Sequence, residues 1–161
     1  MDERKPEAGG ERYRSRAGLR LDRAAPLIWR QYAALPWRRE ASALEVLLIT
    51  SRETRRWIIP KGWPIRGLPP HKAAAREAFE EAGVTGTIAR AAVGFYEYEK
   101  RLKTGNMRPC RVAVFALGVT EQHETWPEKG QRSMRWMPVD EAATMVTEQQ
   151  LADLLRGFSP P

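Results

Sequence analysis

The alternation of apolar and polar positions divides the chain into short strand-like runs that flank one clearly helical stretch. Residues 43–50 form the continuous apolar run of a buried strand, and residues 26–35 predict another strand that ends near Pro36. Residues 57–59 form a short apolar stub. Residues 60–70 contain four prolines and two glycines, and are therefore predicted to be a loop.

A helix is predicted from Lys72 to Ala82. Its apolar positions recur at i, i+3, i+4 and i+7, which places them on one face of a helix; they are Ala75, Ala78, Phe79 and Ala82. Gly83 stands where a C-cap glycine belongs, because glycine readily adopts the left-handed conformation that ends a helix. The pattern therefore predicts one amphipathic helix that ends at Gly83.

The second half of the chain predicts more strands, followed by two late helices. The predicted strands are 85–98, 110–119 and 133–137, with a basic turn at 100–108 that contains Gly105, and the predicted helices are 139–146 and 148–157. Thr147 and Gln150 have the spacing of a capping box at the start of the last helix. Strands with few and late helices indicate an α+β or α/β sandwich.

Composition is typical of one globular domain preceded by a polar arm. The chain has 161 residues, of which 42% are apolar. Residues 1–24 are rich in Arg, Glu and Gly, and are expected to be a basic, disordered arm without the apolar centre of a secretory signal. No run is long enough to span a bilayer, so no membrane partner is expected. The single cysteine, Cys110, fits a reducing cytosol, and we expect a cytoplasmic protein.

The formal charge of +7 indicates affinity for anions such as nucleic acid, membrane surfaces or phosphorylated small molecules. The same charge also serves solubility in many proteins without any anionic ligand. Charge alone therefore leaves the partner open, and the position of the basic residues relative to the acidic ones has to decide it.

Three carboxylates are predicted to share one face of the helix. Glu77, Glu80 and Glu81 lie at i, i+3 and i+4, and we expect them to point away from the apolar face. Like charges this close destabilise a helix, whereas a hard cation such as Mg²⁺ prefers carboxylate oxygens and compensates them. The alternative is a solvated acidic face on which Arg76 pairs with Glu80.

The spacing of these residues resembles the signature of the Nudix family. Six polar or glycine positions match it over 22 residues, namely Gly62, Arg76, Glu77, Glu80, Glu81 and Gly83. Ala78 and Val84 fill its two apolar positions, whereas Leu68 stands where the signature has its first Glu. The resemblance covers residues 25–158 and implies an α/β fold, an α/β/α sandwich around a mixed sheet. It also implies metal-dependent hydrolysis of a phosphoanhydride bond.

The resemblance further implies roles for the individual motif residues. Glu77 and Glu81 are expected to be ligands of Mg²⁺ or Mn²⁺, and Glu80 a ligand or the general base. Arg76 is expected to orient Glu77 through a charge-assisted hydrogen bond. Because the metal-binding face keeps these carboxylates, we expect the chemistry to survive the change at Leu68.

Residues outside the helix are expected to complete the metal site. Gly62 lets the loop approach the helix, and the carbonyl of Lys61 is a candidate metal ligand. A further carboxylate often comes from a distant loop in this family. Glu121 and Glu124 are the candidates for it, and the sequence does not choose between them.

Basic residues beside the motif indicate a substrate with several phosphates. Pro60-Lys61-Gly62 resembles the branch that contains diadenosine-polyphosphate hydrolases and diphosphoinositol-polyphosphate phosphohydrolases. Arg52, Arg108 and Arg111 are predicted, with Lys61 and Gly62, to bind such a substrate, because Arg binds phosphate in a bidentate manner. The alternative is that these arginines are ordinary solvated surface side chains.

Two other functions stay open at this stage. A nucleotide-pool or capped-RNA hydrolase would need aromatic residues that stack on a base, for which Trp63 and Tyr96 are candidates. A non-catalytic module that binds nucleotides or RNA would suit the basic arm. The intact set of Arg76, Glu77, Glu80 and Glu81 favours catalysis, so RNA is the less favoured partner.

Overall fold

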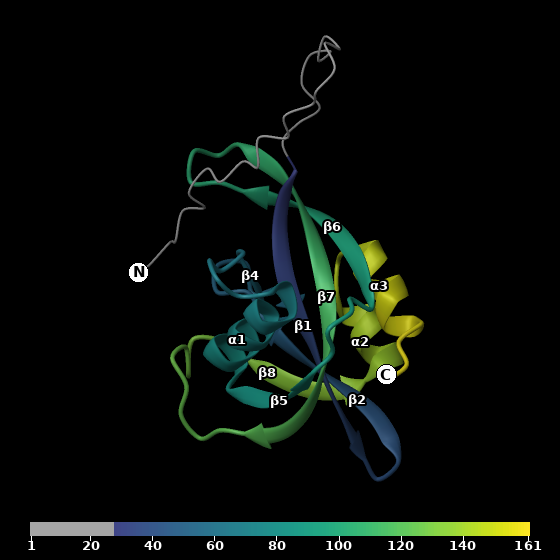
Figure 1. The fold of residues 1–161 in the computed structure, drawn as a ribbon. Helices are drawn as coiled ribbons and strands as arrows, with labels where there is room; N and C mark the ends of the chain where they lie inside the picture. Colours follow the sequence, from purple (N-terminus) through teal and green to yellow (C-terminus); the bar gives the residue numbers. More distant parts are fainter. Residues whose placement is uncertain (1–27) are drawn as a thin grey trace, which may run out of the picture.

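The computed structural model describes residues 28–161, which form one mixed β-sheet with helices on both sides (Figure 1). The predicted arm at 1–24 and the first residues of the predicted domain lie outside this described part, so that boundary stays a prediction. None of the helices in residues 28–161 is long and apolar enough to cross a membrane.

Eight strands and three helices follow one another along the described chain. In order they are β1 (Trp29–Glu40), β2 (Ala43–Thr50), β3 (Trp57–Ile58), β4 (Lys61–Gly62), α1 (Pro70–Ala82), β5 (Val84–Ile88), β6 (Gly94–Arg101), β7 (Met107–Gln122), β8 (Met134–Pro138), α2 (Val139–Met145) and α3 (Gln149–Arg156).

The centre of the sheet is a parallel pair of strands. The strands lie in the order β3-β2-β1-β7-β5, with β4 added to β1, β6 to β7 and β8 to β2. β1 and β7 are parallel, whereas every other pair is antiparallel. The predicted mixed sheet is thereby confirmed.

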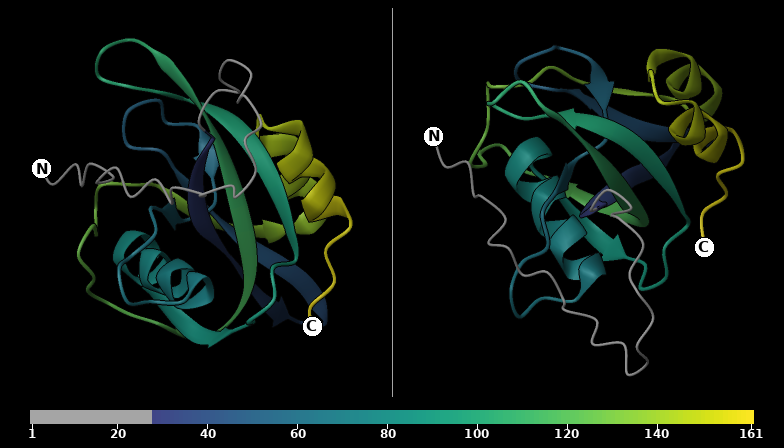
Figure 2. Two further views of the ribbon diagram at one scale, coloured as in Figure 1. Left: turned by 45° about the horizontal axis from the view of Figure 1, so that its top comes forward. Right: turned by 90° about the horizontal axis from the view of Figure 1, so that it is seen from above.

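Each face of the sheet has its own apolar core, and the helices close both cores (Figure 2). The α1 face holds Ala34, Leu47, Ile49, Ile58, Ala74, Ala78, Ala82, Val84, Phe115 and Leu117. The opposite face packs Leu35, Val46, Leu48, Val112, Val114 and Met137 against α2 and α3. Two covered faces make an α/β/α sandwich, so the predicted fold class is correct.

The start and end of α1 follow from proline and glycine. The helix begins at Pro70, two residues before the predicted start, because proline at the first position already has a helical φ and needs no N–H partner there. It ends at Ala82, and Gly83 adopts φ 68° while its N–H donates to the Phe79 carbonyl. The predicted glycine C-cap is therefore confirmed.

The predicted orientation of α1 was wrong. Ala74, Ala78 and Ala82 face the sheet, and Glu77 and Glu81 are buried beside them. Ala75 and Phe79, which were expected on the apolar face, are only half-buried. Alanines on several sides of the helix make its apolar face ambiguous, and the packing turns two of the three carboxylates inward.

β1 does not end near Pro36, as the sequence predicted, but runs on to Glu40. The N–H of Ala34 points to the side of β4, where it donates to Pro60. The nitrogen of Pro36, two residues later, therefore faces that same side. Pairing with β4 ends at Ala33, and pairing with β2 begins only at Trp37. Proline is tolerated because it falls in the gap between two partners.

Residues 85–98 are not one strand, as predicted, but two segments along the same edge of β7. Ile88 pairs with Leu117 and Gly94 pairs with Val114, so residues 89–93 loop out of the ladder. The apolar periodicity continues through residues 89–93, so the hydrophobic pattern could not show that the strand is interrupted there.

The predicted capping box at the start of the last helix was also wrong. The N-cap of α3 is Glu148, and no side chain caps the helix. The Thr147 hydroxyl instead accepts a hydrogen bond from Arg56 (2.8 Å), and Gln150 accepts one from the N–H of Glu97 (2.7 Å). Contacts with distant residues replace the local cap.

Candidate active site

A backbone contact brings the loop before α1 against the carboxylate helix. Gly62 lies in β4, opposite Tyr32 of β1. A Cβ atom built on Gly62 would lie 2.3 Å from Oε1 of Glu77, far inside any normal contact. Glycine at this position therefore lets the main chain pack directly on the Glu77 carboxylate.

The motif carboxylates occupy different environments on α1. Glu77 and Glu81 are 8% and 7% exposed, whereas Glu80 is half-buried. Burial raises the pKa of Glu81 to about 8; Arg132 and Lys61 act in the opposite direction, and the neighbouring Glu77 adds to the rise. The site thus holds carboxylate oxygens that gain from a nearby cation.

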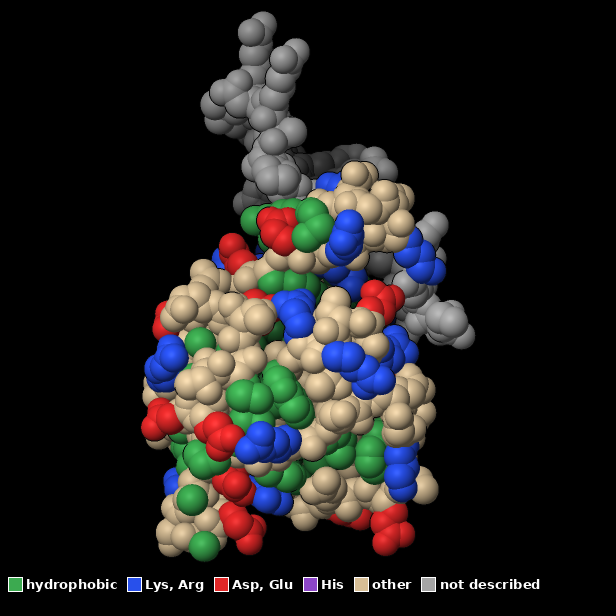
Figure 3. Space-filling model, turned by 180° about the vertical axis from the view of Figure 1, so that it is seen from behind, with side chains coloured by type: hydrophobic (Ala, Val, Ile, Leu, Met, Phe, Trp, Pro, Cys, Tyr) green, Lys and Arg blue, Asp and Glu red, His purple; other side chains and the backbone are tan. Residues whose placement is uncertain are grey.

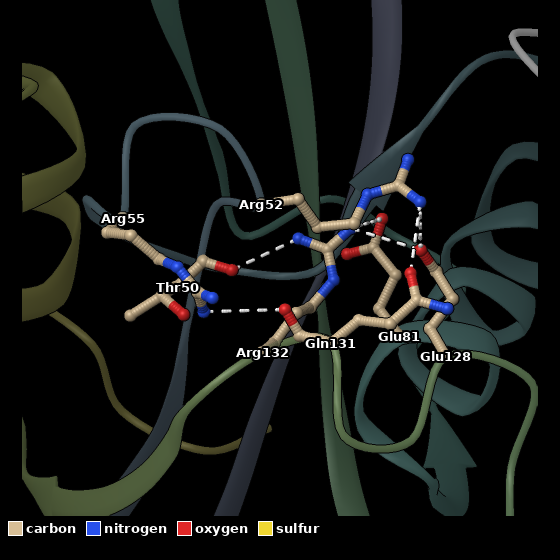
Figure 4. A network of polar contacts seen from close by, with 7 residues as sticks. All are labelled: Thr50, Arg52, Arg55, Glu81, Glu128, Gln131 and Arg132. Atoms are coloured by element: carbon tan, nitrogen blue, oxygen red, sulfur yellow. Dashed lines mark hydrogen bonds and ion pairs between the residues drawn. The ribbon is translucent and has the colours of Figure 1, made fainter. Parts of the chain in front are cut away.

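Arg132 is the buried partner of Glu81 (Figure 4). One nitrogen of its guanidinium lies 3.4 Å from Oε1 of Glu81 and 3.4 Å from Oε1 of Glu128, while the other donates to the Thr50 carbonyl at 3.1 Å. The Arg132 side chain is only 7% exposed. Sequence reasoning missed it, because its partners lie far away along the chain.

Glu128 links this buried pair to Arg52, one of the predicted substrate-binding residues (Figure 4). The Arg52 guanidinium lies 3.1 Å from Oε1 of Glu128 and donates to the Gln131 side chain at 3.2 Å. The Glu128 N–H in turn donates to the Glu80 carbonyl at 3.0 Å. Arg52 is therefore brought next to the carboxylate end of α1.

Glu128 is the distant-loop carboxylate that the structure shows in contact with the end of α1, whereas metal binding by Glu121 or Glu124 stays a prediction. Glu121 and Glu124 are exposed, and Glu121 lies 3.7 Å from His123. No feature of the local sequence distinguishes Glu128. It is selected by the path of residues 123–132, which turn round the end of α1 and pack Trp126 against Gly83.

Lys61 extends the site from the carboxylates towards β6. Burial lowers the pKa of its ammonium group, and Glu81 opposes this shift while Lys100 adds to it. The ammonium lies 5.1 Å from the centre of the Tyr98 ring, and Tyr98 donates a hydrogen bond to Gln31. The structure thus brings the Lys61 side chain, as well as its backbone, to the site.

A second cation–carboxylate pair, missed from the sequence, borders the same region. Arg56 lies 3.0 Å from Glu148 and donates to Thr147 at 2.8 Å. The Glu148 side chain is only 10% exposed. Together with Arg52, this pair connects the loop between β2 and β3 to two distant parts of the chain.

Arg108 and Arg111, predicted to act together, lie on opposite faces of the sheet. Side chains alternate along β7, so Arg108 shares the face of Cys110 and Val112, and Arg111 shares that of Phe115. Arg108 lies 5.9 Å from the Trp29 ring, whereas Arg111 lies over Phe95 at 4.6 Å. Only Arg108 is on the same face as Tyr98.

The two predicted base-stacking residues also differ. Tyr96 is 2% exposed and part of the core, so it cannot receive a base. Trp63 is half-buried and meets Trp29 edge to face at 5.2 Å, with Lys100 at 5.7 Å from its ring. Trp29 was not considered from the sequence, since it lies outside the motif at the start of β1.

Arg76 and Leu68 complete the motif. Arg76 is exposed, and its role in orienting Glu77 stays a prediction. Leu68 is half-buried, and its N–H donates to the Ile65 carbonyl at 3.0 Å. This turn shapes the loop without the carboxylate that the motif has at position 68.

The donor set fits a hard divalent cation that keeps part of its own hydration. Oε2 of Glu81 is buried and has no hydrogen-bond partner among residues 28–161. Within those residues, no group of three or more acidic, histidine or cysteine side chains is arranged so that it could hold a metal ion, so Glu77, Glu80 and Glu81 do not converge on one point as the predicted three-ligand set requires. Mg²⁺ commonly binds through one or two carboxylates, water and substrate phosphates, which is the kind of site Glu77 and Glu81 offer.

Comparisons with known proteins give one family over most of the chain. A family model described as NUDIX domain matches residues 30–158. Nudix hydrolase 12 of Arabidopsis thaliana is 35% identical over 118 residues, which are 71% of this chain and 58% of that protein. Mouse diphosphoinositol polyphosphate phosphohydrolase 3-alpha is 34% identical over 136 residues, covering 80% of this chain and 79% of that protein.

Solved structures agree on the fold. An Ap4A hydrolase of C. elegans superposes with a TM-score of 0.58 at 21% identity, over 81% of this chain and 95% of that chain. A hydrolase from Nitrosomonas europaea gives 0.62 at 16% identity, over 81% and 87%. Matched segments span only 58% and 66% of the first two plant relatives.

Proposed function

Because the chain belongs to the Nudix family, we propose that it is a metal-dependent pyrophosphohydrolase that cleaves a phosphoanhydride bond in an organic polyphosphate. The observation that carries the proposal is the packing of Gly62 on the Glu77 carboxylate, one helical turn from the buried Glu81. Glu81 has Arg132 at 3.4 Å, and its electrostatic neighbours include Lys61 and Glu77.

The chain's own residues hold and orient the reacting groups. Mg²⁺ or Mn²⁺ supplies Lewis-acid charge and a bound water of lowered pKa when it is present. Glu77 and Glu81 would hold the ion, and half-buried Glu80 would be a ligand or the general base that takes a proton from the attacking water. Arg132 fixes the Glu81 carboxylate by its charge, since it is itself anchored on the Thr50 carbonyl.

For the substrate we propose a diadenosine polyphosphate or a diphosphoinositol polyphosphate. Support comes from the mouse relative, named for the second class, and from the Pro60-Lys61-Gly62 resemblance to both classes. Arg52, Lys61 and Arg108 are the proposed phosphate-binding side chains. In phosphoryl transfer the protein mainly positions an anion and stabilises its charge. These three cationic side chains would do both.

A non-catalytic nucleotide- or RNA-binding module is the second candidate. Its support is the net charge of +7. On the face opposite to that of Figure 1, however, Lys and Arg side chains are interspersed with Asp and Glu (Figure 3). A mixed surface of this kind gives little of the counterion-release affinity that a basic nucleic-acid footprint provides.

The deciding experiment is phosphate release from a panel of pyrophosphates with the full chain. The panel contains diadenosine tetraphosphate, a diphosphoinositol polyphosphate, a capped RNA and a nucleoside diphosphate sugar. We expect Mg²⁺-dependent cleavage that stops in excess EDTA, and a large loss of kcat in Glu80→Gln with little change in KM. Glu141→Gln on α2 is the matched control and should behave as wild type.

Two results contradict the proposal. Cleavage that persists after stripping of bound metal would remove the metal role of Glu77 and Glu81. Tight binding of nucleotides without cleavage of any compound, with Mg²⁺ or Mn²⁺ present, would favour the binding module.

A further inference from the structure

An aromatic pair lies immediately beside the motif. Trp63 follows Gly62, whose backbone packs on Glu77, and its ring meets Trp29 edge to face with centroids 5.2 Å apart and planes at 78°. Both rings are half-buried. Indole rings offer large flat faces for stacking, and part of this pair stays open to solvent.

Two cations stand at this pair. The Lys100 ammonium lies 5.7 Å from the Trp63 ring centre, and the Arg108 guanidinium lies 5.9 Å from that of Trp29. Lys100 and Arg108 face each other in the β6–β7 ladder. Both distances are close to the limit of about 6 Å for a cation–π contact, so either side chain can leave its ring at little cost.

These two cations differ from the arginines around the carboxylates. Arg52, Arg56 and Arg132 each pair with a glutamate at 3.0–3.4 Å. Lys100 and Arg108 have no such ion pair with residues 28–161 of the chain. An anion that approaches Lys100 or Arg108 therefore does not compete with a glutamate, as it would at Arg52, Arg56 or Arg132.

Lys61 lies between the carboxylates of α1 and the tryptophan pair. It precedes Gly62, its ammonium lies over Tyr98, and its electrostatic neighbours include both Glu81 and Lys100. The order is thus carboxylates, then Lys61, then Lys100 and Arg108 with the two tryptophans. A nucleoside polyphosphate has the matching order of reacting phosphate, phosphate chain and flat base.

We propose that Trp29 and Trp63 form a nucleoside subsite, in which a nucleobase stacks on Trp63 while Lys100 and Arg108 turn from the rings to the phosphate chain. The proposal rests on the proposed function, and it selects a nucleoside polyphosphate as the substrate class. An inositol pyrophosphate has no π face, so it gains nothing from the two indoles.

The test compares two ligands that differ only in the nucleoside. The ligands are α,β-methylene-ADP and methylenediphosphonate, whose P–C–P bonds resist hydrolysis, and their binding to the full chain is measured by calorimetry with Mg²⁺. We expect wild type to bind the nucleotide more tightly. Trp63→Leu should weaken nucleotide binding roughly 5- to 150-fold, the usual worth of one stacked base, and should leave methylenediphosphonate unchanged.

Matched variants separate stacking from structural damage. Trp63→Phe keeps a stacking ring and should recover most of the affinity. Trp136→Phe alters a tryptophan that packs on the α1 face of the sheet, and should match wild type. Should Trp63→Leu fail to fold, Trp63→His keeps a smaller ring and should show an intermediate loss.

The outcomes distinguish the subsite from the hydrolase assignment. Equal affinity of wild type for both ligands, or an equal loss of both in Trp63→Leu, overturns the subsite. The hydrolase assignment then still stands if the chain cleaves a diphosphoinositol polyphosphate. Conversely, a Trp63-dependent nucleotide affinity in a chain that cleaves no pyrophosphate supports the subsite and rejects the hydrolase.

Discussion

Gly62→Ala tests whether the contact between β4 and α1 sets the catalytic geometry. The added Cβ would lie 2.3 Å from both Cδ and Oε1 of Glu77, more than 1 Å short of an ordinary contact. Because the main chain of β4 is held in the sheet by β1, the carboxylate has to move instead. A misplacement of about 1 Å typically costs on the order of 100-fold in rate.

We therefore expect kcat/KM of Gly62→Ala to fall about 100-fold on the best substrate, with overpacking that costs about 1–3 kcal/mol of stability. Steady-state kinetics and thermal unfolding measure the two effects separately. Gly67→Ala is the control in the same loop. It meets no atom within 4 Å, but its φ of 81° strains alanine, so it should lose stability while keeping its activity. A Gly62→Ala enzyme with wild-type kcat/KM would refute the reasoning.

Three further predictions follow from the positions of single side chains. Leu68→Glu should change kcat/KM less than tenfold, because the loop is already shaped by its backbone turn. A hundredfold gain in kcat/KM would show that the missing carboxylate limits the rate of hydrolysis. Arg52→Ala should raise KM roughly tenfold or more for polyphosphates, the worth of one charged hydrogen bond. Arg111→Ala should not, because the Arg111 guanidinium lies over the Phe95 ring, and equal effects of the two variants in steady-state kinetics would contradict the role given to Arg52. Glu128→Gln should lower kcat/KM and Glu124→Gln should not, because of these two glutamates only Glu128 pairs with Arg132. A larger loss of kcat/KM in Glu124→Gln than in Glu128→Gln would reject a role for Glu128 at the site.

The sequence predicts the local part of the site well. Gly62, Glu77 and Glu81 lie close together in the chain, and the helical period together with a glycine loop brings them together without help from elsewhere. The direction of α1 was harder to predict, because Ala73, Ala74 and Ala75 offer three adjacent apolar positions. Which of them faces the sheet is decided by packing against strands, and no local pattern contains that information.

The residues that complete the site come from distant segments. Arg132 bonds to Thr50 across 82 positions, and Arg56 bonds to Glu148 across 92. Such pairs depend on the order of strands in the sheet, in particular on the pairing of β8 with β2. A single sequence does not reveal that order, so Arg132, Glu128, Glu148 and Trp29 emerge only from the fold.

The parallel pair at the centre of the sheet has a consequence for how the protein reaches its active form. Trp29 pairs with Cys110, so the chain between them, with α1 and its carboxylates, must be made before the central strands can meet. Closing so long a loop is entropically costly and slows folding. During synthesis the acidic helix therefore leaves the ribosome before both β7 and Arg132. We expect enzymatic activity to appear only with the last step of folding, which makes it a sensitive reporter of complete refolding.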